Sequence, residues 1–374
     1  MNTRIGYLTY ALERQPSGIG QYTRRLLQAL QAAGCAPLVL RSGGWPEGLR
    51  QDAYESVRLP GSGLLPALLT LGQVQIGWQA RRRHLALVHD PTGTMPLGLC
   101  PAKRVATIHD AIPFVYPEVS AALDRLIYRL WLPQAVKHAG AVITISQHSK
   151  RDLEKYLKIP GRKISVTPLA AGPKFRLLDE AEIAPVLERA GVQRPYILYV
   201  GSVEPRKNLL RLLDAYHELL KWSPRWQLVI VGARNYWKSS PVVHKVEQLG
   251  LQAQVKFTGY IPDEDLPALY NGAELFCFPS LYEGFGLPVL EAMACGVPVV
   301  TSNSSSLPEV AGEAAMLVDP YNSGEIAAAM RRVLEDKDLR LELREKGLER
   351  VTQFTWERIA HATIAVYEKV LNAP

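Results

Sequence analysis

The chain has 374 residues, of which 47% are apolar and 21% are charged, and its 43 basic and 36 acidic residues give a net charge of +7. These proportions exclude a disordered, collagen-like or low-complexity chain, and the length favours two domains. The charge is divided unevenly. Residues 1–170 hold 21 basic and 10 acidic residues, a net +11, whereas residues 171–374 hold 22 and 26, a net −4. This asymmetry indicates two units that face different partners.

The cysteines and the N-terminus predict a reduced, cytoplasmic protein. None of the four cysteines forms a C-x-x-C pair or another zinc-binding spacing, and Cys277 lies in the apolar run ELFCFP, where we expect it to be buried. The start, MNTRIGYLTY, predicts a strand and no signal peptide. No run approaches the roughly 20 apolar residues of a transmembrane helix.

Short apolar runs that predict buried parallel strands alternate with helical patterns along the chain. In the first half we expect strands at Ile5–Thr9, Pro37–Leu40, Leu85–His89, Arg104–His109, Ala141–Ser146 and Lys163–Pro168, and helices that include Gln21–Ala33 and Leu123–His138. The second half predicts strands at Tyr196–Val200, Gln227–Val231, Val255–Thr258, Glu274–Pro279, Val297–Thr301 and Ala315–Val318, and helices that include Leu209–Lys221, Leu266–Asn271 and Leu287–Cys295. The pattern predicts an α/β protein of two doubly wound parallel-sheet units, each with a nucleotide-sized crevice at its strand C-termini.

The boundary between the units is expected near Ala170–Arg194, a charged segment that contains proline. We assign residues 1–172 to the first domain and residues 173–355 to the second. Helical patterns run from Gly324 to Asn372, and the last of them, within about 356–374, can pack back on the first domain.

Two glycines, Gly18 and Gly20, follow the first strand and open a helix. Paired glycines let the backbone approach a phosphate or sugar at a helix N-terminus. A dinucleotide fingerprint would have Gly or Ala in place of Thr23 and an acid in place of Arg41, so NAD is not expected. A tight β–α turn without a ligand is the alternative.

A second glycine turn begins the second unit, where Gly201 and Ser202 lead to the basic sequence Arg206-Lys207-Asn208. Asn208 can cap the helix that follows, with both cations before its positive end. Two cations beside backbone N–H groups suit a diphosphate, which Arg can bind bidentately. The alternative is a solvated basic turn.

The most specific stretch joins Glu283 to Glu291 through the loop Gly284-Phe285-Gly286-Leu287-Pro288. Eight residues separate the two carboxylates, which is too far to meet one small group but suits an extended ligand. Carboxylates accept hydrogen bonds from sugar hydroxyls, and the loop amides can receive phosphate oxygens. The alternative is two unrelated surface acids.

Together these motifs resemble the family-4 retaining glycosyltransferases of GT-B fold. The early G-I-G, the P-R-K-N turn, the G-F-G-L-P loop, the E-x₇-E spacing and the closing F-T-W-E occur in the family's order, and the similarity covers essentially the whole chain. The resemblance implies two facing Rossmann-like domains with a cleft between them. The second would hold a nucleotide-sugar donor, and the first would hold an acceptor.

Individual roles follow from the same resemblance. It implies that Arg206 and Lys207 hold the donor diphosphate, that Glu283 binds sugar hydroxyls, and that Glu291 binds the ribose. The amides of Phe285–Leu287 would contact sugar and phosphates, Gly18 and Gly20 would leave room for the donor, and His109 would face the donor sugar, although a lone histidine after a strand is more often structural. We also assign to the donor site Gly201, Ser202, Gly232, Tyr260, Ile261, Gly284 and Gly286.

The implied reaction retains the anomeric configuration and needs no metal, because Arg206, Lys207 and a helix end stabilise the leaving diphosphate. We expect Lys207→Ala to reduce turnover sharply with little loss of fold. The acidic run Asp263-Glu264-Asp265 predicts a helix start better than a metal site. A front-face displacement is the family's proposed route.

The donor is expected to be GDP-mannose, because the run R-L-I-Y-R-L-W-L-P-Q-A and the later V-I-T-I-S-Q-H-S-K-R-D-L resemble mannosyltransferase-like members. UDP-glucose, UDP-GlcNAc and UDP-galactose remain open. A sugar-nucleotide epimerase and a non-catalytic nucleotide-sugar-binding scaffold are the other interpretations.

The acceptor is expected to be a glycan or a lipid-linked molecule. The apolar stretch Leu64–Ala80 with Arg81-Arg82-Arg83 can lie on an anionic membrane, although a core helix with a solvated basic end is the alternative. Nucleic acid is not expected, because the basic residues are dispersed. We therefore expect a cytoplasmic enzyme with peripheral membrane contact.

Overall fold

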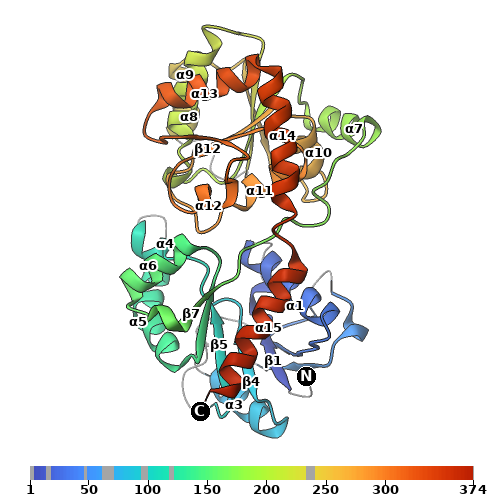
Figure 1. Cartoon of the computed structure of the whole chain (residues 1–374), viewed down its shortest axis with the longest axis vertical. Helices are drawn as coiled ribbons and strands as arrows, with labels where there is room; N and C mark the ends of the chain where they lie inside the picture. The colour runs from blue at the N-terminus through green and yellow to red at the C-terminus, as the bar shows by residue number, and fades with distance from the viewer. Residues whose placement is uncertain are drawn as a thin grey trace. The chain divides into compact units, whose positions relative to one another are not determined.

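A computed structural model describes residues 4–13, 18–45, 49–60, 71–93, 100–117, 122–232 and 241–373. The chain divides into two compact units (Figure 1), of which unit 1 is Met1–Leu169 with Thr355–Pro374 and unit 2 is Ala170–Phe354. The first boundary lies three residues before the expected one at 172/173. The closing helix is part of unit 1.

Unit 1 is built on a parallel sheet of seven strands in the order β3-β2-β1-β4-β5-β6-β7. The strands are β1 (Ile5–Leu8), β2 (Leu38–Arg41), β3 (Ser56–Arg58), β4 (Leu87–Asp90), β5 (Lys103–Thr107), β6 (Ala141–Thr144) and β7 (Ile164–Val166). The helices are α1 (Gly18–Ala32), α3 (Gln73–Arg82), α4 (Ile112–Val115), α5 (Ala122–His138), α6 (Gln147–Leu157) and α15 (Trp356–Asn372). Although α15 ends the chain, it packs against α1, β5 and β6 (Figure 1).

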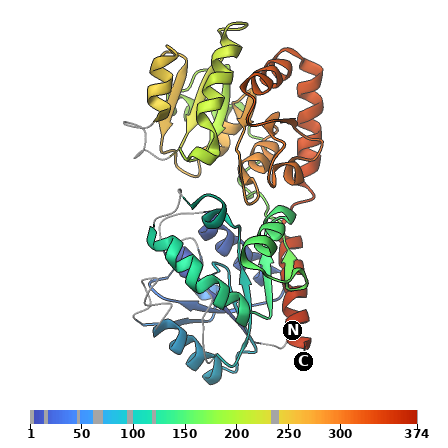
Figure 2. The same cartoon turned by 90° about the vertical axis from the view of Figure 1, so that its left-hand side faces the viewer.

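Unit 2 repeats this plan with six parallel strands in the order β10-β9-β8-β11-β12-β13. They are β8 (Tyr196–Val200), β9 (Gln227–Val231), β10 (Val255–Gly259), β11 (Leu275–Phe278), β12 (Val299–Ser302) and β13 (Met316–Val318). The helices are α7 (Glu180–Ala190), α8 (Leu209–Leu220), α9 (Pro241–Gln248), α10 (Leu266–Asn271), α11 (Leu287–Ala294), α12 (Leu307–Ala311), α13 (Ser323–Glu335) and α14 (Lys337–Val351), and they flank the sheet (Figure 2).

The structure confirms the predicted α/β class, with two doubly wound parallel sheets. Several elements were not predicted, among them β3, α6 and α7. The edge strand β3 has one buried residue, Val57, and α6 has the strongly polar sequence QHSKRDLEKYL, so neither gives a long apolar signal. Helix α7 lies inside the segment expected to be a boundary, where Asp179 caps it by accepting a hydrogen bond from the Glu182 amide at 3.1 Å.

Helix α3 covers the C-terminal part of the stretch expected to be a membrane-surface helix, and residues 61–70 lie outside the described residues. Cys35, Cys100, Cys277 and Cys295 are free thiols, and Cys277 is fully buried as predicted. Among the residues that the structure describes, no helix is both long enough and apolar enough to cross a membrane.

Candidate active site

In unit 2 the strand order reverses between β8 and β11, which are neighbours in the sheet. Loops that leave the C-terminal ends of strands at such a reversal form the usual ligand crevice of doubly wound sheets. The loop after β8 carries Gly201, Ser202, Arg206 and Lys207, and the loop after β11 carries Glu283. The fold therefore brings together residues that lie 76 positions or more apart in the chain.

Glu283 makes ion pairs with both cations of the basic turn. Its Oε1 lies 2.6 Å from Lys207 Nζ, and its Oε2 lies 3.1 Å from Arg206 Nη1. The side chains of Glu283, Lys207 and Arg206 are only 9%, 10% and 11% exposed, so the basic turn is not a solvated one. Lys207 Nζ also lies 4.9 Å from the centroid of the Phe278 ring, a favourable cation–π distance.

Further hydrogen bonds fix this cluster. Arg206 Nε donates to Glu204 at 2.7 Å, and Ser202 Oγ donates to the same carboxylate at 2.7 Å. Ser280 Oγ donates to Glu283 Oε1 at 2.7 Å. Burial by itself would raise the pKa of Glu283, but the charges of Lys207 and Arg206 outweigh it and hold this pKa below its ordinary value. Glu283 is therefore ionised at neutral pH.

The predicted capping role of Asn208 is wrong. Asn208 precedes α8 but has a left-handed backbone with φ of 62°, and its side chain accepts no hydrogen bond from a helix amide. Its Nδ2 donates instead to the carbonyl oxygens of Pro279 at 2.9 Å and Pro320 at 2.6 Å. Asn208 thus joins the basic turn to the loop after β11.

The glycine-rich loop ends at Gly286, which has φ of 108° and directly precedes α11. A Cβ there would come within 2.6 Å of the side chain of Leu307. Two serine hydroxyls in the segment after β12 stabilise this loop. Ser306 donates to the carbonyls of Glu283 and Phe285 at 2.9 and 2.7 Å. Ser305 accepts from the Glu283 amide at 3.1 Å. Sequence analysis missed these serines because Ser-Asn-Ser-Ser-Ser has the composition of an ordinary turn.

The second predicted carboxylate, Glu291, lies on α11 and is partly buried. Its Oε2 accepts a hydrogen bond from the Tyr270 hydroxyl at 3.3 Å. Burial raises the pKa of Glu291 to about 7, although the Lys174 charge and the Tyr270 hydrogen bond act in the opposite direction. Strongly shifted pKa values cluster at functional sites, which makes Glu291 a candidate site residue.

The remaining predicted donor residues of unit 2 lie at the same edge of the sheet. Gly232 follows β9, and Tyr260 and Ile261 follow β10, where the Tyr260 side chain is 69% exposed. The acidic run that follows them in the chain forms ion pairs: Asp263 pairs with Lys174, and Asp265 pairs with Arg189 at 3.1 Å. As expected, this run leads into a helix, α10.

In unit 1 the strand order reverses between β1 and β4, and His109 follows the neighbouring β5. His109 Nε2 lies 3.0 Å from the Pro91 carbonyl, and the Tyr22 ring contacts the imidazole edge-on at a centroid distance of 4.7 Å. A carbonyl can only accept, so Nε2 carries the hydrogen and Nδ1 is an acceptor. Burial lowers the pKa of His109 to about 4, which leaves the imidazole neutral at pH 7.

Behind His109 lies a buried polar chain that sequence analysis missed. Tyr22 and Thr107 share a hydrogen bond of 3.1 Å, and Thr107 Oγ1 lies 2.9 Å from His89 Nε2. His89 Nδ1 lies 2.6 Å from the hydroxyl of Tyr367 on α15. This contact joins the last helix to β4 of unit 1. Gly18 and Gly20, expected to lead into a helix at Gln21–Ala33, already lie in the first turn of α1.

Comparison with known proteins identifies the family. The family described as Glycosyltransferase Family 4 matches residues 16–171, and Glycosyl transferases group 1 matches residues 186–350. An O-antigen chain mannosyltransferase B from Escherichia coli is 36% identical over 308 residues, which are 82% of this chain and 80% of that protein. The chain belongs to glycosyltransferase family 4. A second relative of this glycosyltransferase, the MMP α-(1→4)-mannosyltransferase of Mycolicibacterium hassiacum, is 28% identical over 98% of both chains.

Solved structures agree on the fold of this glycosyltransferase. The Anabaena protein HepE, determined in complex with UDP and glucose, superposes with a TM-score of 0.78 at 19% identity and covers 98% of this chain and 100% of its own. At that identity the likeness establishes the GT-B fold alone. The resemblance that the sequence motifs indicated is therefore confirmed, and the enzyme is a glycosyltransferase.

Proposed function

We propose that this glycosyltransferase moves mannose from GDP-mannose to a glycan or lipid-linked acceptor, with retention of configuration and without a metal. The observation that carries the donor site is the buried cluster of Arg206, Lys207 and Glu283 at the strand reversal of unit 2. The choice of mannose is supported by the relatives named mannosyltransferases, one of them 36% identical.

The cluster is arranged to receive a diphosphate by direct hydrogen bonds. Arg206 and Lys207 are balanced by Glu204 and Glu283, so net charge alone does not attract the donor. The two carboxylates fix the cations in place, which avoids a reorganisation cost when the leaving group develops charge. Lys207 Nζ has three donors, of which Glu283 takes one, and the α11 N-terminus adds backbone amides.

The rest of the donor is assigned to the neighbouring loops. We assign the ribose hydroxyls to the Glu291 carboxylate and the sugar hydroxyls to Glu283. The sugar and phosphate oxygens are assigned to the amides of Phe285–Leu287. Among the described residues, the amides of Phe285 and Gly286 have no hydrogen-bond partner, so they are available to a ligand. We further propose that neutral His109 accepts a hydrogen bond from the donor sugar through Nδ1.

The proposed reaction is a front-face displacement. The bond between the anomeric carbon and the diphosphate oxygen breaks, and the electron pair leaves with the diphosphate, where Arg206 and Lys207 stabilise it. The acceptor hydroxyl oxygen attacks the same face, and its proton passes to the departing phosphate oxygen. Glu283 is held by two cations, so we do not assign it as a nucleophile.

The donor is tested by incubating the enzyme with GDP-mannose, UDP-glucose, UDP-GlcNAc or UDP-galactose across a panel of glycan and polyprenyl-linked acceptors, with and without EDTA. We expect mannosylated product from GDP-mannose alone, equal rates with EDTA, and an α-linkage by NMR. Loss of activity with EDTA, a β-linkage, or product from a UDP-sugar would each reject the corresponding part of the proposal. Donor conversion without acceptor would indicate an epimerase, and binding without any conversion would indicate a scaffold.

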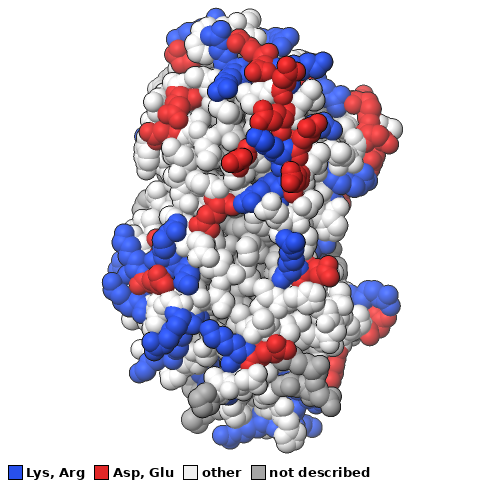
Figure 3. All heavy atoms as spheres, viewed as in Figure 1, with Lys and Arg blue, Asp and Glu red and all other residues white. Residues whose placement is uncertain are grey.

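Helix α3 supports peripheral contact with the cytoplasmic face of an anionic membrane, the proposed location of a lipid-linked acceptor. Val74 and Trp78 on α3 are 73% and 53% exposed, and Leu71 just before the helix is 55% exposed. The Arg82 guanidinium lies 5.0 Å from the Trp78 ring, so charge and apolar surface adjoin. Figure 3 shows Lys and Arg predominating on one face of unit 1, whereas both signs interleave on unit 2. An apolar surface flanked by cations suits an anionic interface.

This contact is tested by sedimentation with phosphatidylglycerol vesicles. The variant Val74→Ser with Trp78→Ser should lose vesicle binding while it keeps activity on a water-soluble acceptor. The matched control is Trp222→Ser with Leu341→Ser, which removes two apolar residues of unit 2 that are each 48% exposed. Equal vesicle binding by the wild type and both variants would reject the membrane role and leave the proposed reaction intact.

A further inference from the structure

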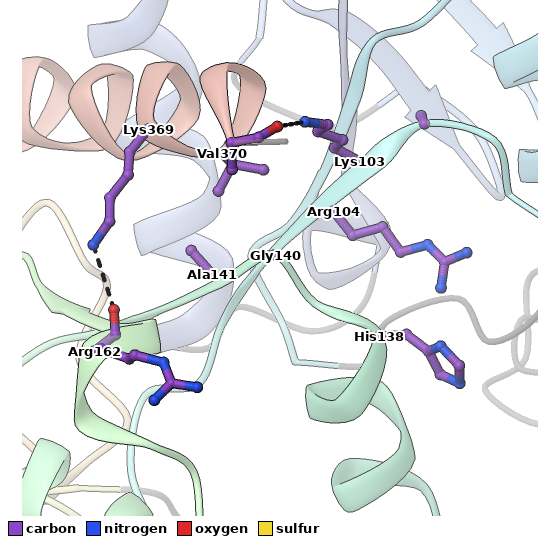
Figure 4. A pocket seen from close by; sticks show the side chains of 10 residues that line it. Lys103, Arg104, His138, Gly140, Ala141, Arg162, Lys369 and Val370 are labelled. Carbon is purple, nitrogen blue, oxygen red and sulfur yellow. Dashed lines mark hydrogen bonds between the residues drawn. The ribbon is translucent and has the colours of Figure 1, made fainter.

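A second pocket lies in unit 1, at the end of the sheet where the strands begin, whereas His109 lies where β5 ends. It is a cavity of about 360 Å³ where β5 and β6 begin, because Lys103 and Ala141 are the first residues of those strands and both line it (Figure 4). The ends of α5 and α15 close it through His138 and Lys369. Neither the family's motifs nor the proposed donor site uses any of these residues.

The lining of this pocket is cationic and contains no carboxylate. Lys103, Arg104, Arg162 and Lys369 contribute four positive charges, and His138 adds an imidazole. A pocket of similar size on unit 2, about 380 Å³, provides a contrast. It is lined by Arg194, Lys337, Arg340 and Arg344, but Glu180 and Glu274 also line it, and Glu180 pairs with Arg194 at 2.9 Å.

The cations of the unit 1 pocket are held by backbone carbonyls. Lys103 Nζ donates to the carbonyls of Leu371 and Ala373 at the end of α15, and Lys369 Nζ donates to the Arg162 carbonyl at 3.3 Å (Figure 4 shows the Ala373 and Arg162 bonds). Lys103, Arg162 and Lys369 make no ion pair with any carboxylate of the described residues. The pocket therefore keeps uncompensated positive charge.

Helix ends do not account for this charge. The C-termini of α5 and α15 each present the equivalent of about half a negative charge, or about one charge together. Lys103, Arg162 and Lys369 outweigh these helix ends by roughly two positive charges. Arg104 donates to the Cys100 carbonyl at 3.1 Å, whereas the Arg162 guanidinium makes no hydrogen bond with a described residue.

We infer that this pocket binds a phosphate-bearing anion. A guanidinium can take two oxygens of one phosphate, and ammonium groups serve as point charges beside it. The volume suits a phosphate group with the substituent it is esterified to. Free phosphate and the headgroup of a phospholipid share this chemistry, so both are probes of the same pocket.

The first probe is inorganic phosphate at constant ionic strength, with the imidazole resonance of His138 as a local reporter that donor-site binding does not move. His138→Gln assigns the resonance. We expect it to shift saturably, and we expect at least tenfold weaker binding in the variant Arg162→Gln with Lys369→Gln. The variant Lys337→Gln with Arg344→Gln removes two charges from the unit 2 pocket and should bind phosphate at His138 like the wild type.

The second probe distinguishes the two sources. If the ligand is a lipid headgroup, Arg162→Gln with Lys369→Gln also weakens sedimentation with phosphatidylglycerol vesicles relative to the control variant. If it is free phosphate, the two variants bind vesicles equally. Should the double variant not fold, Arg162→Gln alone serves, because its guanidinium supports no described contact. A His138 resonance that phosphate does not move, or that moves equally in wild type and variant, would overturn the inference.

Discussion

Lys207 Nζ and Glu283 Oε1 lie 2.6 Å apart, although the two residues are 76 positions apart in the chain. The strands β8 and β11 are neighbours, so the sheet order alone creates this contact. The roles assigned to these residues, diphosphate binding and sugar binding, are therefore coupled. A change to either one alters the position and charge balance of the other.

Lys207→Ala should lower both turnover and stability. The loss of a preorganised donor to the leaving group should reduce kcat by on the order of 10²–10³. Glu283 would keep Arg206 and Ser280 as partners but lose its closest cation, so unfolding should become easier by about 1–3 kcal/mol. This differs from the sequence-based expectation of little loss of fold, because the lysine is buried. Steady-state kinetics and urea unfolding measure the two effects.

Two further variants distinguish the contribution of the Lys207–Glu283 ion pair from the loss of the lysine side chain itself. Adding Glu283→Gln to Lys207→Ala removes the buried carboxylate that has lost its closest cation. The double variant should therefore be more stable than the sum of the two single losses predicts. Lys221→Ala breaks an exposed pair with Glu218 on the end of α8 and should cost no more than about 0.5 kcal/mol. Strictly additive losses would contradict the coupling.

Donor affinity should depend on pH through Glu291, whose pKa is raised to about 7. Only the ionised carboxylate accepts hydrogen bonds from both ribose hydroxyls, so GDP-mannose should bind more tightly as the pH rises from 6 to 8. The diphosphate diester does not titrate in this interval. Isothermal titration at several pH values measures the dependence.

Glu291→Gln is the control for that dependence. The amide should bind the donor several-fold more weakly at pH 8 and should show a flat profile between pH 6 and 8. A flat profile for the wild type, or an unchanged slope for Glu291→Gln, would remove the ribose assignment without affecting that of Lys207.

The strands could be predicted because parallel strands buried on both faces have continuous apolar sequences. Tyr196–Val200 and Gln227–Val231 have the predicted bounds in the structure. The edge strand Ser56–Arg58 could not be found in this way, since one of its three residues is buried. The same reason applies to α6, whose helical pattern consists mostly of polar residues.

The sequence predicted which residues belong to the site but not the contacts between them. Motif order identified Lys207 and Glu283 separately, whereas their ion pair depends on the strand order, which sequence periodicity does not give. Asn208 was assigned to capping because Asn is a good N-cap, but its left-handed backbone turns the amide toward two carbonyls. The supporting hydroxyls of Ser305 and Ser306 have no signature beyond turn composition.

Gly286→Ala should impair the donor loop more than it impairs the fold. The backbone at φ of 108° disfavours any side chain, and the new methyl group would meet Leu307 at 2.6 Å. We expect a loss of about 1–3 kcal/mol in stability and a larger relative loss of donor affinity, because the amides of Phe285 and Gly286 would move. Gly324→Ala, at a glycine whose nearest Cβ contact is 3.4 Å, is the control. Equal losses of stability and donor affinity in Gly286→Ala and Gly324→Ala would contradict the conformational constraint at Gly286.

The stability of the enzyme should fall as the pH decreases below about 6.5, because His89 and His109 are held neutral in the native state with pKa values lowered by burial to about 3 and about 4. The unfolded chain binds protons at these histidines near pH 6.5, so between pH 6.5 and about 4 it binds more protons than the native state. Each histidine should contribute a slope of up to about 1.4 kcal/mol per pH unit.

His109→Gln should reduce that slope, since glutamine can still donate to the Pro91 carbonyl but does not titrate. His361→Gln, on the exposed face of α15, is the matched control for the loss of an imidazole. Urea unfolding at pH 6.5, 5.5 and 4.5 gives the free energies. The other titrating groups contribute equally to the wild type and to both variants, so the differences between the slopes isolate the contribution of His109. Identical slopes for the wild type and His109→Gln would show that this imidazole is already accessible to protons in the native enzyme.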